Sequence, residues 1–129
     1  MALSIITSCQ NKNETEKTMP FKNDITILEN VISLSGKNLE YNYGDYIYQI
    51  NFKSENKLHW KCLKGDEKGE EAVETYSMQR LNNHTFFISW IEENGLSVSQ
   101  VINLKDKKVN SFLKIEKDII PLLGTIRQL

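Results

Sequence analysis

The segment from Ser89 to Leu104 constrains the fold of this chain most, because it specifies two β-strands and the turn between them. Apolar and polar residues alternate on both sides of Asn94-Gly95, a dipeptide that tolerates positive φ and favours tight hairpin turns. One face of the pair would carry Phe86, Ile88, Trp90, Glu92, Leu96, Val98, Gln100, Ile102 and Leu104. The sequence therefore predicts an antiparallel β-hairpin, against which the rest of the chain can be tested.

Strand-like segments continue from Lys37 to the end of the chain, with no second segment of helical period. We expect eight strands, over residues 39–43, 46–52, 58–62, 72–81, 85–92, 96–104, 109–115 and 121–129. Short loops join them, which favours an antiparallel meander, and closure into a barrel removes the exposed edges of such a sheet. The predicted fold class is all-β, a closed antiparallel up-and-down barrel of about eight strands, with an open sandwich as the alternative.

A short helix is expected before the first of these strands. Thr26 and Glu29 have the spacing of a capping box, and apolar residues that follow fall on one helical face. Gly36 is placed to end the helix in the left-handed conformation. We expect this helix to lie over one end of the barrel.

The first residues of the chain differ in character from the rest. Met1–Cys9 is short and apolar, and its end, Ile6-Thr7-Ser8-Cys9, resembles the lipobox of bacterial lipoproteins, where small residues precede a cysteine that is lipidated. It lacks the basic and longer apolar regions of a full secretory signal. We therefore expect a truncated lipoprotein-type signal and flexible linker over 1–22 and the folded domain over 23–129.

A signal completed upstream would place the protein in the bacterial cell envelope, anchored through Cys9. Otherwise the protein would be cytoplasmic, with a frayed N-terminus and a free thiol.

Charge and cysteine content narrow the function classes. The 129 residues fit one domain, and 16 Lys plus Arg against 17 Asp plus Glu give a formal net charge of -1, which argues against a nucleic-acid partner. The two cysteines lack metal-ligand spacing, so no metal site is expected. No apolar run approaches the roughly 20 residues of a membrane-spanning helix. His59 and His84 are interpreted as surface residues.

The central hairpin also resembles those of two known families. An aromatic run that ends Trp-x-Glu, a Gly turn and then Val-Ser-x-Val-x-Asn-Leu are similar to the hairpin of the phenolic acid decarboxylases and of the MoaF-like proteins, both small calycin-type barrels. The resemblance extends over roughly 25–113. It implies a calycin or lipocalin-like barrel, and barrels of this size hold one small ligand inside.

The resemblance also suggests site residues. In the decarboxylases, the hydroxyls of a Tyr-x-Tyr pair hold the substrate carboxylate, and an Arg and a Glu complete the site. By position, Tyr41 and Tyr43 match the pair, and Glu74 matches the acid. The Arg has no counterpart, because Glu67-Lys68-Gly69 stands in its place and lysine does not reproduce the guanidinium fork. This departure, together with Glu93-Asn94 in place of a Pro-Thr, favours the MoaF-like branch, which has no established reaction.

The ligand-binding candidates are Tyr41, Tyr43, Glu74, Trp60 and Trp90, and each has a structural alternative. The tyrosines have the spacing of any half-buried strand, and the tryptophans are more often core residues than ligand contacts. Glu74 is either buried with a raised pKa, ready for proton transfer, or solvated at the start of a strand. The other residues of interest are interpreted structurally, with Glu92 solvated at the turn and Cys62 an inert core thiol.

These observations favour a small-molecule-binding, lipocalin-like barrel protein of the MoaF-like type, without cofactor or metal. The expected partner is a small amphiphilic or aromatic ligand, and a homodimer remains open. The alternatives are a cofactor-free decarboxylase of hydroxycinnamic acids, with Glu74 as its catalytic residue, and a purely structural or interaction barrel. We expect decarboxylation to be absent or very weak, because the arginine that would complete the carboxylate site is missing.

Overall fold

The computed structural model describes residues 32–129, and this part of the chain is built entirely from antiparallel strands and turns. The strands are β1 (Asn38–Asn42), β2 (Ile47–Phe52), β3 (Lys57–Lys64), β4 (Glu71–Thr75), β5 (Ser77–Asn82), β6 (Thr85–Ile91), β7 (Ser97–Asn103), β8 (Lys108–Ile115) and β9 (Asp118–Gln128). The lipobox resemblance, Cys9 and the domain boundary at 22/23 lie outside the described residues.

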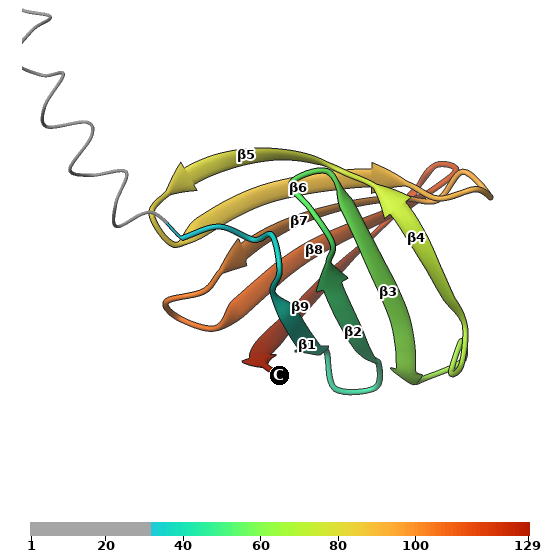
Figure 1. Cartoon of the computed structure of the whole chain (residues 1–129). Coiled ribbons are helices and arrows are strands. Elements are labelled where there is room, and N and C mark those ends of the chain that lie inside the picture. Colours follow the sequence, from blue (N-terminus) through green and yellow to red (C-terminus); the bar gives the residue numbers. More distant parts are fainter. Residues whose placement is uncertain (1–31) are drawn as a thin grey trace, which may run out of the picture. The chain divides into compact units, whose positions relative to one another are not determined.

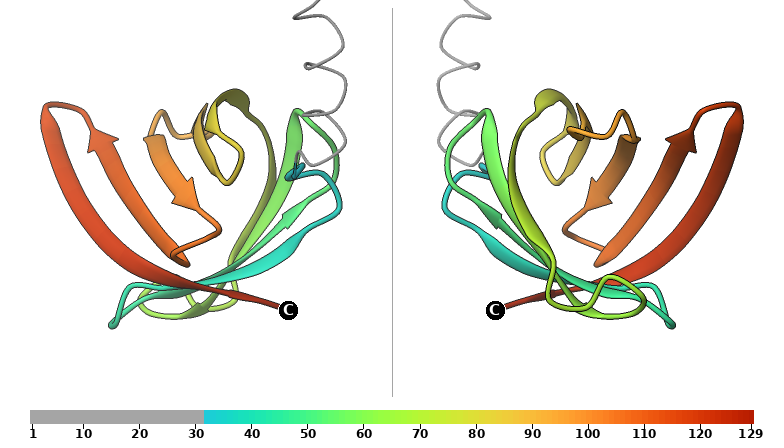
Figure 2. Two further views of the ribbon diagram at one scale, coloured as in Figure 1. Left: turned by 90° about the vertical axis from the view of Figure 1, so that its left-hand side faces the viewer. Right: turned by 90° about the vertical axis from the view of Figure 1, so that its right-hand side faces the viewer.

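The nine strands form one sheet in the order β4-β3-β2-β1-β9-β8-β7-β6-β5 (Figure 1). The first and last strands of the chain pair in the middle of this order, with Tyr41 opposite Ile126. The sheet curls round on itself (Figure 2), and its two edges are the consecutive strands β4 and β5. The predicted all-β antiparallel barrel is confirmed in a nearly closed form.

One predicted strand is in fact two, which explains both the extra strand and the gap in the barrel. Residues 72–81 were expected to form a single strand, but the chain leaves β4 at Thr75 and begins β5 at Ser77. Tyr76 between them is 2% exposed, and its hydroxyl donates to the carbonyl of Ser54 at 2.8 Å. Burial of this ring turns the chain from one edge of the sheet to the other.

The central hairpin is confirmed in its register. Ile88 lies opposite Gln100 and Trp90 opposite Val98 across β6 and β7. The turn uses positive φ only at Gly95, where φ is 91°, and the side-chain oxygen of Asn94 accepts from the backbone N–H of Leu96 at 3.0 Å. A type I-like turn followed by a left-handed glycine is a common three-residue hairpin connection.

The expected helix near the start of the domain falls mostly outside the described residues. The described residues just before β1 include a turn at 34–36, where Gly36 has a φ of 86°. The backbone N–H of Gly36 donates to the carbonyl of Phe52 at 2.8 Å, which ties this turn to β2. Among residues 32–129, no helix is long and apolar enough to cross a membrane.

The inward face of the barrel carries the apolar residues of the alternating pattern. The core includes Leu39, Tyr41, Ile50, Phe52, Leu58, Trp60, Cys62, Phe86, Ile88, Trp90, Val98, Ile102 and Val109. Cys62 is 1% exposed and packs in this core, as its spacing with Leu58 and Trp60 predicted. The core fills much of the barrel, and the space that remains lies among the aromatic residues near one end.

Candidate functional site

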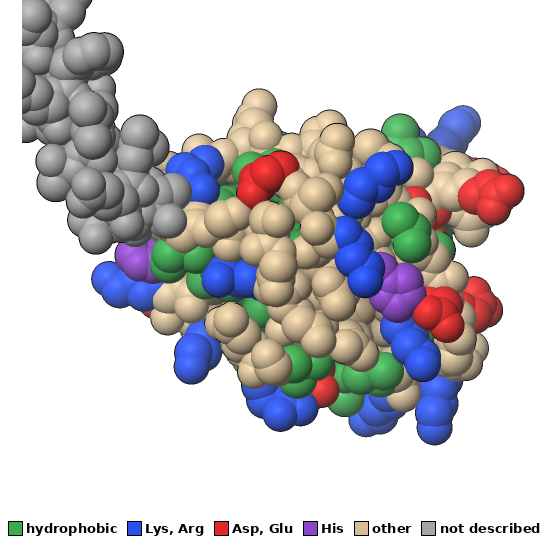
Figure 3. Space-filling view, viewed as in Figure 1, with side chains coloured by type: hydrophobic (Ala, Val, Ile, Leu, Met, Phe, Trp, Pro, Cys, Tyr) green, Lys and Arg blue, Asp and Glu red, His purple; other side chains and the backbone are tan. Residues whose placement is uncertain are grey.

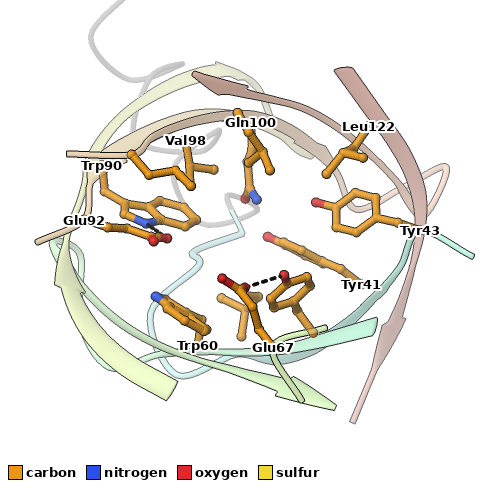
Figure 4. Close-up of a pocket in the computed structure, with 13 residues that line it drawn as sticks. Tyr41, Tyr43, Trp60, Glu67, Trp90, Glu92, Val98, Gln100 and Leu122 are labelled. Carbon is orange, nitrogen blue, oxygen red and sulfur yellow. Dashed lines mark hydrogen bonds between the residues drawn. The ribbon is translucent and has the colours of Figure 1, made fainter. Parts of the chain in front are cut away.

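A cavity of about 60 Å³ opens inside the barrel, and five aromatic, five aliphatic and three polar side chains line it (Figure 4). Strands β1, β2, β3, β6, β7, β8 and β9 contribute to it, as do the β3–β4 loop and the β6–β7 turn. Its lining comprises Tyr41, Tyr43, Tyr48, Ile50, Trp60, Glu67, Trp90, Glu92, Leu96, Val98, Gln100, Leu113 and Leu122. Polar atoms are few within this wall, so each one that faces the cavity restricts what the cavity accepts.

Two polar side chains deep in the barrel form what we call the floor of the cavity, Tyr41 on β1 and Gln100 on β7. They are 1% and 4% exposed, and both point into the cavity (Figure 4). The Tyr41 hydroxyl and the Gln100 Oε1 atom are buried without a hydrogen-bond partner. Burial, and then the neighbouring Tyr43 and Tyr76, raise the pKa of Tyr41 well above its usual value, so its hydroxyl stays neutral. Two unpaired polar atoms in one cavity are free to bind a ligand.

Tyr43 follows β1 and forms a side wall, and its hydroxyl is hydrogen-bonded. Its oxygen lies 2.7 Å from the Ser111 Oγ atom on β8. Burial raises the pKa of Tyr43 to about 12, although the hydrogen bond with Ser111 acts in the opposite direction. The ring packs over Gly124, where an added Cβ atom would lie 2.7 Å from the Tyr43 Cδ1 atom. Gly124 therefore leaves room for this tyrosine in the wall.

Tyr48 and Glu67 join the wall to the loop between β3 and β4. The Tyr48 hydroxyl donates to the Glu67 Oε1 atom at 3.0 Å. Burial first, and then this hydrogen bond and the carboxylate charge, raise the pKa of Tyr48. Gly65 takes a φ of 124° at the start of the loop, where a Cβ atom would clash with the Tyr46 ring. The glycine allows the loop to bring Glu67 over the open end of the barrel.

Two tryptophans at this open end, which we call the mouth, each hold a carboxylate. The Trp60 indole N–H donates to the Glu74 Oε2 atom at 3.0 Å, and the Trp90 indole N–H donates to the Glu92 Oε2 atom at 3.3 Å. Both rings are also buried, at 8% and 5% exposed. Trp60 and Trp90 therefore both pack in the core and line the cavity.

Glu92 is half-buried rather than solvated, so the expectation for this residue is wrong. The chain bends into the turn after β6, and this bend directs the carboxylate back over the cavity, where Trp90 donates to it. Burial is the main cause that raises the pKa of Glu92, and the charges of Glu74, Glu67 and Glu70 raise it further, whereas the Trp90 hydrogen bond lowers it. The carboxylate therefore lies in a field of like charge.

The mouth continues into a second hollow of about 320 Å³, which shares Trp60, Glu67 and Glu92 with the cavity. Six of its lining residues are glutamates, Glu67, Glu70, Glu71, Glu74, Glu92 and Glu93. Acidic side chains gather at the right-hand end of Figure 3, where Figure 1 places the β3–β4 loop and the β6–β7 turn. Despite these acids, residues 32–129 contain no group of three or more His, Cys, Asp or Glu placed to hold a metal ion.

Four of the five predicted ligand contacts line the cavity, namely Tyr41, Tyr43, Trp60 and Trp90. Glu74 lies in the acidic hollow instead, 9% exposed and bonded to Trp60, so it is buried but does not line the cavity with the tyrosines. Their roles in binding stay predictions.

Sequence reasoning did not select three of the polar residues that line the cavity, Tyr48, Glu67 and Gln100. Gln100 carried a visible signal, since it is the one amide on the apolar face of β7 between Val98 and Ile102. Glu67 carried none, because a charged residue in a polar loop has no periodicity from which to infer its direction.

Comparisons with known proteins agree with this architecture. A family model described as MoaF-like matches residues 35–127. A crystal structure from Burkholderia vietnamiensis, of a protein described as a candidate beta-lactamase, superposes with a TM-score of 0.71 at 19% sequence identity, covering 77% of this chain and 98% of that one. At that identity the likeness shows the fold alone. A search of curated proteins found no significant match.

Proposed function

Since this chain belongs to the MoaF-like family, whose model spans its barrel, we propose that it is a small-molecule-binding barrel protein. The ligand would enter at the mouth and reach the floor, between the aromatic walls. Family membership does not supply a reaction, so the proposal rests on the cavity itself.

The observation that carries the proposal is the pair of unpartnered polar atoms on the floor, the Tyr41 hydroxyl and the Gln100 Oε1 atom. A buried polar group without a partner destabilises a protein by about 1–3 kcal/mol, so such groups are rare. Two of them facing one cavity are explained if a ligand satisfies both when it binds. A purely structural barrel would gain stability from apolar residues at these positions.

The size of the cavity limits how much of the ligand is enclosed. Its 60 Å³ is well below the roughly 300–1,000 Å³ of typical small-molecule sites. The hollow at the mouth adds about 320 Å³ of partly open space. We therefore expect a ligand that buries one narrow end on the floor and leaves the remainder between Trp60 and Trp90 at the mouth.

Intrinsic fluorescence tests the proposal, because both tryptophans of the chain line the cavity. The protein is titrated with phenolic acids, short fatty acids and aromatic amines, and we expect a saturable change with at least one of them. Tyr41→Phe and Gln100→Leu should weaken that response. Tyr46→Phe is the matched control, since its hydroxyl lies outside the cavity, near Asp66 at 3.4 Å. No response across the panel from folded protein would overturn the proposal in favour of a structural barrel.

Decarboxylation of hydroxycinnamic acids is the alternative function, and two features argue against it. Glu74 lies in the hollow rather than beside Tyr41 and Tyr43, and among residues 32–129 no lysine or arginine lines the cavity to hold a carboxylate. We expect turnover of p-coumarate to equal the no-protein control. Turnover above it that Glu74→Gln abolishes would establish the enzyme instead.

A lipid anchor at Cys9 is a separate proposal about location, supported by the Ile6-Thr7-Ser8-Cys9 sequence. Its test is metabolic labelling with a fatty-acid analogue of the full gene product in a bacterial host, including any in-frame extension upstream of Met1. We expect label in the protein and its loss in Cys9→Ser. An unlabelled protein in the soluble fraction would refute the anchor and leave the barrel proposal untouched.

A further inference from the structure

We propose that the ligand is a small organic cation, held through a protonated nitrogen at the mouth. This inference rests on the proposed function, because it names the ligand class of the same cavity. The argument combines the charge at the mouth, the donors that the carboxylates already accept, the aromatic walls and the unpartnered floor.

Charge at the mouth is one-sided. Among the described residues, those that line the cavity or the adjoining hollow include six glutamates and no lysine or arginine. The formal net charge of the whole chain is only -1, so this clustering is a local feature and not a consequence of an acidic protein. Within residues 32–129, the one basic side chain that forms an ion pair with this cluster is His59, whose Nε2 atom lies 2.7 Å from the Glu71 Oε1 atom. A carboxylate ligand would meet repulsion here, and a cation would meet attraction.

Three of these carboxylates accept hydrogen bonds from neutral donors. Glu67 accepts from the Tyr48 hydroxyl, Glu74 from the Trp60 indole and Glu92 from the Trp90 indole. Such bonds orient each carboxylate and satisfy one oxygen, but they leave its charge uncompensated. Burial is the main cause that raises the pKa of Glu92, and the nearby charges of Glu74, Glu67 and Glu70 raise it further. A bound cation would neutralise part of this negative charge.

Aromatic rings surround the place where such a cation would lie. The Tyr48 and Trp60 rings meet edge to face with centroids 6.1 Å apart, and Tyr43 continues the row at 6.4 Å from Tyr48. Edge-to-face packing leaves some ring faces directed toward the cavity, and an aromatic face attracts a cation through its quadrupole. Rings and carboxylates together form a site that favours an ammonium over a neutral group of the same shape.

The floor supplies the second, independent observation that a ligand is bound here. Gln100 presents an unpartnered acceptor oxygen, and Tyr41 presents a hydroxyl that can donate or accept. Tyr41 and Gln100 line the same cavity as Trp60, Glu67 and Glu92, so floor and mouth belong to one space. A ligand of suitable length would place its cation at the mouth and a small polar or narrow end on the floor.

Three probes that differ mainly in charge, and that share a phenol for the floor, test the inference, namely tyramine, 2-(4-hydroxyphenyl)ethanol and 3-(4-hydroxyphenyl)propionate. Calorimetry at pH 7 should give the amine at least tenfold higher affinity than the alcohol, with the weakest binding for the acid, since a charge-assisted hydrogen bond contributes enough for about that factor. Glu67→Gln and Glu92→Gln should each lower the ratio of amine to alcohol affinity about tenfold, and circular dichroism of each variant checks that it is folded.

Asp106→Asn is the matched control, because it removes the same charge in the β7–β8 turn, at the opposite end of β7 from the mouth. If amine affinity falls equally in all three variants, the effect comes from the net charge of the protein and not from a site at the mouth. That result would overturn the inference. Binding of the acid or the alcohol as tight as that of the amine would also overturn the inference, while the small-molecule function stands. The function itself fails only if the wider panel of fluorescence ligands gives no response.

Discussion

The floor and the mouth of the cavity differ in whether their polar groups have hydrogen-bond partners. At the mouth, three carboxylates each accept a hydrogen bond from an aromatic donor, as Glu74 does from Trp60 at 3.0 Å. On the floor, the Tyr41 hydroxyl and the Gln100 Oε1 atom are more deeply buried and have no partner. The protein itself thus orients the polar groups at the mouth, whereas those on the floor gain a hydrogen-bond partner only when a ligand binds.

This difference means that polar groups in one cavity have opposite effects on the stability of the fold. The hydrogen-bonded groups at the mouth stabilise the fold, and their bonds orient the carboxylates. Unpaired groups on the floor oppose folding, as functional groups commonly do. Substitutions at the two places should therefore have opposite effects on the free energy of unfolding.

The largest effect is expected at the mouth, from Trp60→Phe. Loss of the indole N–H leaves the Glu74 carboxylate, 9% exposed, without its donor, and we expect the free energy of unfolding to fall by about 3 kcal/mol. Trp90→Phe is the matched variant and should cost about 1 kcal/mol, because Glu92 is only half-buried and water can replace the donor. Urea unfolding followed by circular dichroism measures both. Equal losses would show that ring volume, and not the bond to a carboxylate, sets the cost.

The next effect is expected in the wall beside the floor, from Gly124→Ala. A Cβ atom at this position would lie 2.7 Å from the Tyr43 ring and 2.8 Å from the Asn42 carbonyl oxygen, so ring and strand must shift. Overpacking of this kind should lower the free energy of unfolding by about 2 kcal/mol. Thr125→Ala, one residue along β9 and exposed, is the control, with little change expected. A neutral Gly124→Ala would mean that Tyr43 has room to move and that this wall is not fixed.

A smaller effect of opposite sign is expected on the floor. Tyr41→Phe removes a buried hydroxyl without a partner, so the free energy of unfolding should rise by about 1 kcal/mol while ligand affinity falls. Tyr43→Phe removes a hydroxyl that is bonded to Ser111, and it should lower the free energy of unfolding by about 1 kcal/mol. Thermal unfolding of the two variants side by side gives the comparison. Loss of stability in Tyr41→Phe would show that its hydroxyl has a partner, such as a bound water.

Periodicity in the sequence was sufficient for the barrel but not for its gap. Alternation along β6 and β7 fixed which residues face inward, and the family resemblance pointed to Tyr41 and Tyr43 on the correct wall. The break at Tyr76 was missed, because alternation continues across it and only contacts with the distant β2–β3 turn bend the chain there. The strand break therefore depends on long-range packing, which cannot be inferred from a single sequence.

The acids of the mouth were harder to predict than its aromatic residues. Trp60 and Trp90 lie on regular strands, whose period gives the direction of each side chain. Glu67 lies in a loop, and its direction depends on the left-handed conformation at Gly65 and on a bond to Tyr48 from another strand. Charge in loops usually means solvated surface, so a site built from loop carboxylates gives no signal until the fold brings them together.

The smallest effect concerns the pH dependence of stability at Glu92. Burial raises its pKa above the ordinary value of 4.5, with Glu74, Glu67 and Glu70 acting in the same direction and Trp90 against them. The folded protein therefore binds this proton more tightly than the unfolded chain does. The resulting stabilisation is fully present below pH 4.5 and is lost as the pH rises through the raised pKa.

Glu92→Gln removes this titration, so the stability of the variant relative to wild type should increase between pH 4 and pH 7. Urea unfolding across that range measures the difference, with Asp106→Asn as the control at the far end of the barrel. If an organic cation occupies the mouth, amine affinity should rise over the same pH range in the wild type and less so in Glu92→Gln, because the ionised carboxylate is the form that attracts it. A stability difference independent of pH would mean that Glu92 titrates alike in the folded and unfolded chains. The hydrogen bond from Trp90 would then fully offset the burial and the neighbouring charges that act on Glu92.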